Sequence, residues 1–188
     1  MTLGFGHVGR VSVLVAVASA LWAAGETAAE SPEGDNAEVQ RLADEDQEDR
    51  RAGPNIDWSV VKPRDDARLE RIKELYKEGA LRTGRDWLNA ALILQHSNEA
   101  DDYLLAHEMC VAALALGESR AKWLAAASED RFLMAIGRKQ RFGTQYVAAD
   151  QTGAFRLADT DDDVSDELRK ALGAPPLADA KARADQLK

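Results

Sequence analysis

The chain has 188 residues, with 24 basic and 33 acidic side chains and a formal net charge of −9. This charge opposes binding to phosphate backbones and to anionic lipid, so nucleic acid is disfavoured as a partner. A single cysteine, Cys110, excludes an intrachain disulfide, so the core has to hold the fold.

The first 25 residues have the pattern of a secretory signal peptide. One positive charge at Arg10 precedes an apolar run over residues 11–24, and small residues then allow cleavage after Gly25 or after Ala29. The run is shorter than the roughly 20 apolar residues that a membrane-spanning helix needs, which makes a permanent anchor the weaker alternative. We therefore expect an exported protein, periplasmic or secreted, with no membrane span after cleavage.

A linker and a polar helix are expected next. Residues 26–36 are small, acidic and turn-rich, which is typical of a flexible linker. Residues 37–51 have a helical pattern with few apolar positions. Prolines within residues 52–64 are expected to prevent a continuous helix there. The apolar side chains of this stretch that we expect in the core are Ile56, Trp58 and Val60.

Four helices with short breaks follow, a pattern that predicts antiparallel hairpins with repeat-like packing. The first is expected to be capped by Asp65 or Asp66 and to run to Gly79. The second begins at Thr83 or Gly84, where a capping residue precedes an apolar repeat. The other two are expected over residues 102–116 and 121–136.

The C-terminal part has a different pattern. Residues 145–148 and 154–157 flank a turn-rich stretch and are expected to pair as a small β-hairpin. Thr160 or one of Asp161–Asp163 is expected to cap a helix, and a last helix follows. The sequence thus predicts a mostly α fold: a single compact domain of antiparallel helical hairpins over residues 37–188, with a small β-hairpin near the C-terminus.

Two charges interrupt the apolar helix of residues 121–136. Asp130 stands at the margin of an apolar arc and Arg131 inside it, on a helix that is apolar on nearly all sides. Such a helix is central, so at least one of the two charges should be substantially buried, with a polar partner close by. Two interpretations stay open: a structural ion pair, or an anion site at Arg131 in which Asp130 orients the guanidinium group.

The histidines offer weaker signals. His96, beside Gln95 at a helix end, is the best general base available if the protein is an enzyme, although a structural histidine is the alternative. His107 and Cys110 are three residues apart, but zinc would need further ligands, and Cys110 in an apolar stretch is expected to be a buried, inert thiol. The acidic run DTDDDVSDE lacks the glycine and glutamate of a calcium loop. We predict no metal and no cofactor.

Residues 45–177 resemble a family of bacterial proteins of unknown function. The motifs that carry the resemblance are a QH helix end, a WLAAA-x-DR helix and a Q-x-x-GTQ stretch, preceded by an acidic DQ-x-x-R element. The stretch SEDR departs slightly from the usual pattern, and QHS stands where many members have QHG. The resemblance implies no activity. It singles out the matching polar positions Asp46, Gln47, Arg50, Gln95, His96, Asp130, Arg131, Gln140, Thr144 and Gln145.

These observations lead to one functional hypothesis and two alternatives. The hypothesis is an exported helical binding or scaffolding domain with a buried Asp/Arg/Gln/His polar centre for an unknown protein or small anionic ligand. In it, Arg131 binds the anion, Asp130 holds Arg131, and the surrounding amide and hydroxyl groups come from Gln95, Gln140, Thr144 and Gln145. One alternative is a hydrolase-like enzyme in which His96 is the general base, assisted by Asp130 or Arg131. The other is a purely structural cell-envelope protein.

Overall fold

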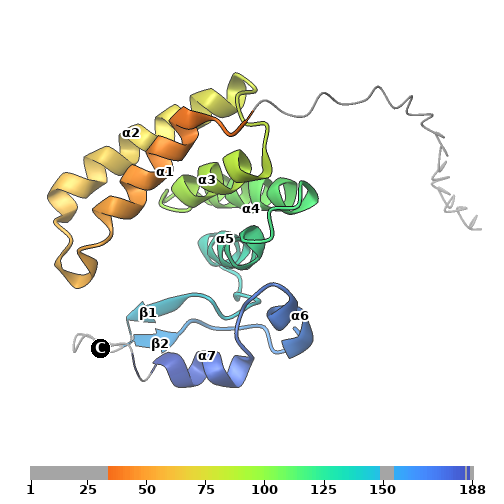
Figure 1. Cartoon of the computed structure of the whole chain (residues 1–188). Helices are drawn as coiled ribbons and strands as arrows, with labels where there is room; N and C mark the ends of the chain where they lie inside the picture. Colours follow the sequence, from red (N-terminus) through yellow and green to blue (C-terminus); the bar gives the residue numbers. More distant parts are fainter. Residues whose placement is uncertain (1–33, 149–154, 185, 187–188) are drawn as a thin grey trace, which may run out of the picture. The chain divides into compact units, whose positions relative to one another are not determined.

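Helices make up most of the structure, which is a computed structural model describing residues 34–148, 155–184 and 186. In these residues the helices are α1 (Ala37–Asp49), α2 (Trp58–Lys77), α3 (Gly84–Leu94), α4 (Ala100–Ala115), α5 (Ala121–Ala135), α6 (Asp166–Ala171) and α7 (Leu177–Ala184), with a 3-10 turn η1 (Gly53–Asn55). The strands β1 (Tyr146–Ala148) and β2 (Phe155–Leu157) pair antiparallel. The predicted mostly α fold with a small pair of strands near the C-terminus is confirmed (Figure 1).

The predicted signal peptide, most of the predicted linker and the turn between the strands lie outside the described residues. The last residues of the linker range are attached to the start of α3. Asn36 caps α1 by accepting a hydrogen bond from the N–H of Glu38 at 2.9 Å, and its own N–H donates to Asp86 Oδ1 at 2.8 Å. Asp35 accepts from Thr83 Oγ1 at 2.8 Å. The first turn of α1 is thereby fixed against the first turn of α3.

The helix α2 begins earlier than the sequence pattern predicted. Asp57 caps it by accepting from the N–H of Ser59 at 3.0 Å, and Pro63 lies inside the helix. Proline removes the hydrogen bond to the carbonyl four residues earlier, which here belongs to Ser59 in the first turn. Because Ser59 is exposed, its carbonyl can bond to solvent instead. The predicted start at Asp65 or Asp66 is therefore wrong.

The early start of α2 also changes which side chains face inward. Trp58 and Val60 were expected in the core, but they are 58% and 44% exposed, and Ile56 is only half-buried. The buried side chains of α2 are instead Val61, Asp65, Arg68, Ile72 and Leu75. Two of these are charged, so the inner face of α2 brings ionised groups toward α1 and α3.

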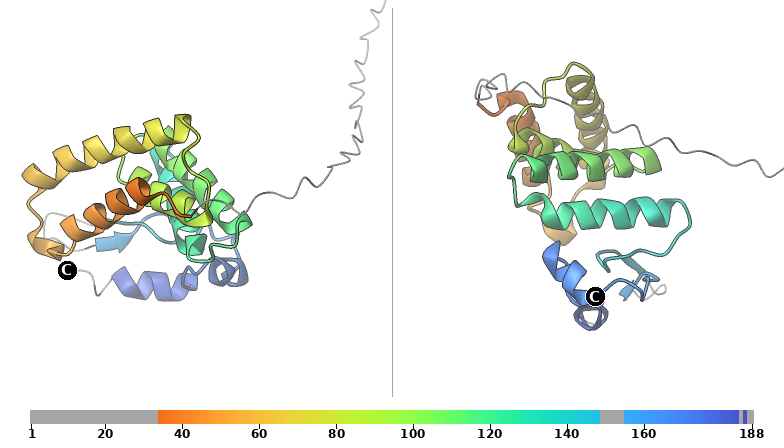
Figure 2. Two further views of the ribbon diagram at one scale, coloured as in Figure 1. Left: turned by 45° about the horizontal axis from the view of Figure 1, so that its top comes forward. Right: turned by 90° about the vertical axis from the view of Figure 1, so that its right-hand side faces the viewer.

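The helices α3, α4 and α5 are joined by short turns and pack one against the next, with α4 and α5 side by side in Figure 2. Gly84 shows how close the contact is, because a Cβ there would lie 2.8 Å from Cβ of Glu118 in the turn between α4 and α5. Small side chains allow the helices to approach closely across the core. The buried alanines that α3, α4 and α5 contribute to the core cluster are Ala90, Ala91, Ala106, Ala113, Ala121 and Ala125.

The segment before α6 is used in backbone pairing. Neither Thr160 nor an aspartate of 161–163 caps this helix; Ser165 does so, with its side chain accepting from the N–H of Leu168 at 3.2 Å. The reason is a bridge to the loop after α5. Gln140 donates its N–H to the carbonyl of Asp159 at 3.0 Å, and its own carbonyl accepts from the N–H of Asp161 at 2.7 Å. The helix can begin only after this bridge ends.

Candidate functional site

Asp130 on α5 is fully buried, at 0% exposed, which confirms that the helix carries a buried charge. Its carboxylate accepts from the backbone N–H of Arg141 at 2.6 Å, of Phe142 at 2.9 Å and of Thr144 at 3.1 Å. It also accepts from Thr144 Oγ1 at 2.7 Å. Gly143 lets the loop curve around the carboxylate with a φ of 74°. Asp130 thus holds the loop that follows α5, mostly through backbone groups.

The glutamines of this loop are also bound to backbone groups. Gln140 is 0% exposed, and its Nε2 donates to the carbonyls of Gln145 at 3.0 Å and of Ala158 at 2.9 Å. Its Oε1 accepts from the N–H of Gln145 at 2.9 Å. The amide of Gln145 donates to Thr144 Oγ1 at 2.9 Å and to the carbonyl of Ala127 at 3.4 Å. We call Asp130, Gln140, Thr144 and Gln145 the loop clamp.

Arg131 does not take part in the loop clamp. Its side chain is half-buried, and among the described residues it has neither a hydrogen bond nor an ion pair, while its Nε is buried without an acceptor. Adjacent helix residues point about 100° apart, so Asp130 cannot face the guanidinium group. The prediction that Asp130 orients the guanidinium group of Arg131 is therefore wrong, and Gln140, Thr144 and Gln145 are engaged in the loop clamp.

A second group of buried charges lies at the end of α1. Asp46 is 1% exposed, and its Oδ1 lies 2.8 Å from Nη1 of Arg50. Gln47 donates from Nε2 to Asp46 Oδ2 at 2.9 Å. The Nε2 of His96, at the end of α3, lies 3.4 Å from the same Oδ2. The DQ-x-x-R and QH motifs, which are about fifty positions apart in the chain, therefore meet at one carboxylate.

Arginines extend this group across to α2. Arg50 contacts Asp65 through both terminal nitrogens, at 3.2 and 2.9 Å. Arg68 places Nη2 at 2.7 Å from Asp65 Oδ1 and at 2.9 Å from Asp49 Oδ2, and Arg64 donates to Asp49 Oδ1 at 2.7 Å. Three carboxylates thus face three guanidinium groups. We call the set the charge network: Asp46, Asp49, Arg50, Arg64, Asp65, Arg68 and His96.

The arginines keep two of these carboxylates ionised. Burial opposes ionisation of Asp65, but hydrogen bonds from Arg50 and Arg68 outweigh it and hold the pKa of Asp65 below its usual value. The pKa of Asp49 is lowered for the same reason, with burial outweighed by Arg68 and Arg64. Burial works against the charge of Arg68 too, yet its hydrogen bonds to Asp65 and Asp49 raise the pKa of Arg68.

The turn that carries His96 is held by contacts with Asp102 on α4. Ser97 donates its hydroxyl to Asp102 Oδ2 at 2.6 Å, and Lys73 on α2 lies 2.8 Å from the same oxygen. Gln95 is 9% exposed, and its amide has no hydrogen bond within the described ranges. No hydrogen bond or ion pair between described residues joins this turn to the loop clamp, so the expected single polar network is two separate clusters.

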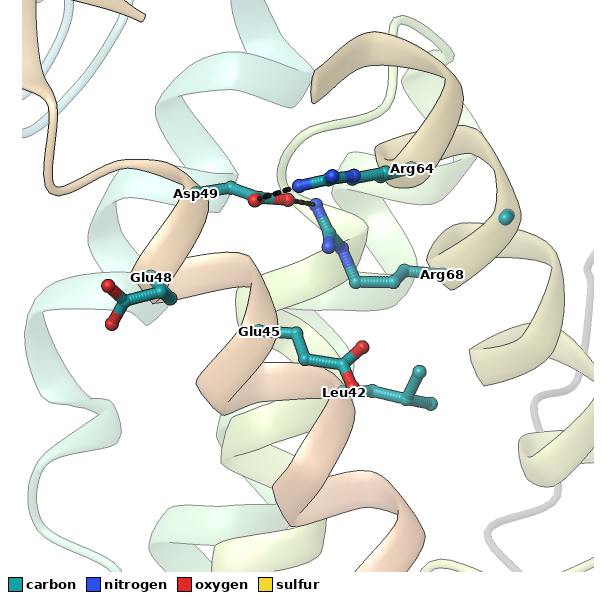
Figure 3. A pocket seen from close by; sticks show the side chains of 7 residues that line it. Leu42, Glu45, Glu48, Asp49, Arg64 and Arg68 are labelled. Atoms are coloured by element: carbon teal, nitrogen blue, oxygen red, sulfur yellow. Dashed lines mark hydrogen bonds and ion pairs between the residues drawn. The ribbon is translucent and has the colours of Figure 1, made fainter. Parts of the chain in front are cut away.

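A groove of about 530 Å³ lies between α1 and α2, beside the charge network (Figure 3). Its lining residues are Leu42, Glu45, Glu48, Asp49, Arg64, Ala67 and Arg68. Every carboxylate comes from α1 and both guanidinium groups come from α2. Asp49 joins the two walls, as Figure 3 shows. Arg68 is only 5% exposed, and its Nε, which makes no hydrogen bond among the described residues, lies 4.0 Å from Oδ1 of Asp46.

Sequence reasoning missed the α2 half of this network. Asp65 was interpreted as a helix cap, and Arg64 and Arg68 were not singled out. The signal was present in the spacing of Val61, Asp65, Arg68, Ile72 and Leu75, which places the two charges on one face with three apolar residues. Pro63 hid this face, because it argued against a helix that begins before residue 65.

His107 and Cys110 lie where a structural role explains them. The Nδ1 of His107 lies 2.9 Å from the carbonyl of Ala125, which ties α4 to α5. Cys110 is 0% exposed, and burial raises the pKa of its thiol to about 12. A thiol with this pKa is a poor nucleophile and a poor metal ligand. Within the described ranges, no group of three or more His, Cys, Asp or Glu residues is arranged to hold a metal ion.

Comparisons with family models, with curated proteins and with solved structures gave no match to this chain. The family resemblance therefore stays a prediction. The geometry pairs its four motifs two by two: Asp46 of DQ-x-x-R contacts His96 of QH, and Asp130 of DR binds Thr144 of GTQ.

Proposed function

We propose that the chain is an exported helical binding domain whose ligand site is the groove between α1 and α2, together with the charge network beside it. One observation carries this proposal: a groove of about 530 Å³ has carboxylates on its α1 wall and guanidinium groups on its α2 wall, and Asp49 and Arg68 connect it to the buried charge network. A volume of this size suits a small ligand. Walls of opposite charge give such a groove the means to bind a charged small ligand.

The energetics of the network support a role beyond packing. Replacing a buried ion-pair network with apolar side chains of similar volume is often neutral or stabilising, so such a network is a poor device for stability alone. Its outer member Arg64 is accessible, with a side chain that is 57% exposed, and the neighbouring groove residue Glu45 is 49% exposed. Exposed ion pairs contribute little to the stability of the fold, so a charged ligand can compete for their members.

This proposal moves the site away from Arg131. The polar groups of Gln140 and Thr144 already bind backbone groups or Asp130, and the amide N–H₂ of Gln145 is engaged as well. These side chains would have to break hydrogen bonds of the fold before they could orient an anion. At the exposed end of the charge network, Arg64 would have to give up only its hydrogen bond to Asp49, which keeps Arg68 as a partner.

Export is part of the proposal and is supported by the sequence alone. Residues 1–25 have the pattern of a signal peptide, and they lie outside the described residues. Across the described ranges, none of the helices combines the length and the apolar character that a bilayer span requires.

An NMR titration of the ¹⁵N-labelled protein tests the binding proposal. A panel of small cations, anions and zwitterions should move the amide signals of α1 and α2 and leave those of the loop clamp in place. Ala67→Trp places a large ring at the groove from an exposed position and should abolish these shifts. Ala115→Trp, at an exposed alanine of α4, is the matched control and should not. Shifts that survive Ala67→Trp, or no shifts with any compound, would refute the site.

A hydrolase-like enzyme is the second candidate, and one contact favours it. The Oδ2 of Asp46 lies 3.4 Å from Nε2 of His96, so the buried carboxylate can stabilise a protonated ring electrostatically, although the two atoms form no hydrogen bond. The other ring nitrogen, Nδ1, has no partner among the described residues and is free to accept a proton from water or a hydroxyl group. In this candidate Asp46 takes the assisting role that was expected of Asp130 or Arg131.

Turnover measurements separate the two candidates. If the protein is an enzyme, His96→Ala abolishes hydrolysis of a substrate found in a broad ester, amide and phosphate screen, and Asp46→Asn lowers kcat more than it changes KM. A matched His107→Ala variant should keep the activity, since His107 contacts a backbone carbonyl of α5. An absence of turnover throughout the screen would leave binding as the function.

A further inference from the structure

We infer that the groove between α1 and α2 takes a small zwitterion, with its ammonium group at Glu45 and its carboxylate at Arg64. This inference rests on the proposed binding function and adds the charge pattern of the ligand. It follows from the way the two walls divide the charges. The α1 wall carries Glu45, Glu48 and Asp49, whereas the α2 wall carries Arg64 and Arg68.

The exposed groups on the two walls are the ones that a ligand can reach. Among the described residues, Glu45 pairs only with Arg41, at 2.6 Å, and their side chains are 49% and 57% exposed. Within the same described ranges, Arg64 pairs only with Asp49, at 2.7 Å, and its side chain is 57% exposed. Both are weak surface pairs. If Arg64 turns to a ligand carboxylate, Asp49 keeps Arg68 as its partner at 2.9 Å.

The groove also offers an apolar surface between its charged groups. Leu42 and Ala67 line it, and in Figure 3 the side chains of Leu42 and Glu45 extend toward α2 whereas Glu48 points away. Glu45 and Asp49 are one helical turn apart along α1, which is about 6 Å. Because Arg64 contacts Asp49, the acidic contact at Glu45 and the basic contact at Arg64 have about this spacing. This spacing fits a compact ligand that carries both charges and an aliphatic side chain, such as a free aliphatic amino acid.

A ligand with one charge fits this arrangement less well. A lone cation attracted to Glu45 also approaches the guanidinium groups of Arg64 and Arg68, and a lone anion attracted to Arg64 approaches Glu45. Like charges at these distances repel and offset part of the attraction. A zwitterion places an opposite charge at each wall.

Calorimetric titration of the full chain with three matched probes tests the inference: L-leucine, isocaproate, which lacks the ammonium group, and isoamylamine, which lacks the carboxylate. Leucine should bind, and each single-charge analogue should bind at least about tenfold more weakly. Glu45→Gln and Arg64→Gln should each weaken leucine binding by about tenfold or more. Lys62→Gln changes an exposed residue of α2 outside the groove and should leave the affinity unchanged.

Three results would overturn the inference. The first is equal affinity for leucine and for either analogue, and the second is unchanged leucine affinity in both Glu45→Gln and Arg64→Gln. The third is no heat and no groove shift with leucine while other compounds of the panel move the α1 and α2 signals. In this third case the zwitterion is wrong and the binding function stands. If no compound moves these signals, the zwitterion inference and the proposed binding function are both refuted.

Discussion

The loop clamp and the charge network both bury carboxylates, but they stabilise them differently. Asp130, at 0% exposed, accepts three backbone N–H groups and one hydroxyl group, and no cation contacts it among the described residues. Asp46, at 1% exposed, faces the guanidinium group of Arg50, an amide and the ring of His96. The carboxylate of Asp130 is held mainly by backbone N–H groups, whereas that of Asp46 is held by side chains.

This difference separates a role in folding from a role in binding. Backbone donors move only if the loop moves, so the loop clamp is intact or broken together with the fold around it. Side-chain partners can rearrange within a folded protein, and those of the charge network reach the wall of a groove (Figure 3). Substitutions should therefore affect mainly stability at the loop clamp, and both stability and ligand response at the charge network.

The largest effect is expected for Asp130→Ala. The substitution leaves three backbone N–H groups without their acceptor in a buried position, and it should lower the free energy of unfolding by about 3–5 kcal/mol. Urea unfolding followed by circular dichroism measures this loss. Thr144→Val removes only one of the four donors and should cost about 1 kcal/mol. A loss below that of Thr144→Val would show that the loop is held by other contacts.

Arg68→Met should have the next largest effect. It removes the guanidinium group that Asp49 and Asp65 share, and about 2–4 kcal/mol of stability should be lost because two carboxylates keep fewer partners. In a double-mutant cycle with Asp65→Asn, the double variant should lose less than the sum of the single variants, because each single variant strands a charge. Strictly additive losses would mean that the two side chains are not coupled.

Acid should weaken the charge network in a predictable direction. Asp49 and Asp65 have pKa values held below the usual value by their arginines, so each adds stability above the unfolded-state pKa of about 4. This contribution is lost as the pH falls through that value toward the lower folded-state pKa. The free energy of unfolding should therefore decrease below about pH 5, and Arg68→Met should flatten that decrease. If the free energy of unfolding of Arg68→Met depends on pH as steeply as that of the original chain, Arg68 is not the cause of the acid sensitivity.

Local pattern predicted the elements where the chain's own preferences agree with its packing. The apolar repeat after Thr83 placed α3, where the structure shows a capping box of Thr83 and Asp86, and the all-round apolar pattern of α5 predicted a buried charge there. The start of α2 was missed because Pro63 disfavours a helix locally, whereas contacts of Arg68 with α1 favour it. Tertiary contacts of this kind are not visible in a short window of sequence.

The partners of the buried charges were harder to predict than their burial. Helical spacing shows which side of a helix a residue occupies, but not which distant groups meet it. Asp130 is met by N–H groups of a loop, and backbone donors carry no residue-type signal. The contact between Asp46 and His96 joins two motifs that resemblance alone had grouped, and only the fold brings them within 3.4 Å.

The smallest effect is expected for Arg131→Ala, and it gives the sharpest contrast with its neighbour. Arg131 has no hydrogen bond or ion pair within the described residues, so its removal strands no partner and should cost less than about 1 kcal/mol. Urea unfolding of this variant beside Asp130→Ala compares adjacent positions on one helix. A loss as large as that of Asp130→Ala would mean that the guanidinium group has a partner in solution. It would then restore Arg131 as the centre of the site.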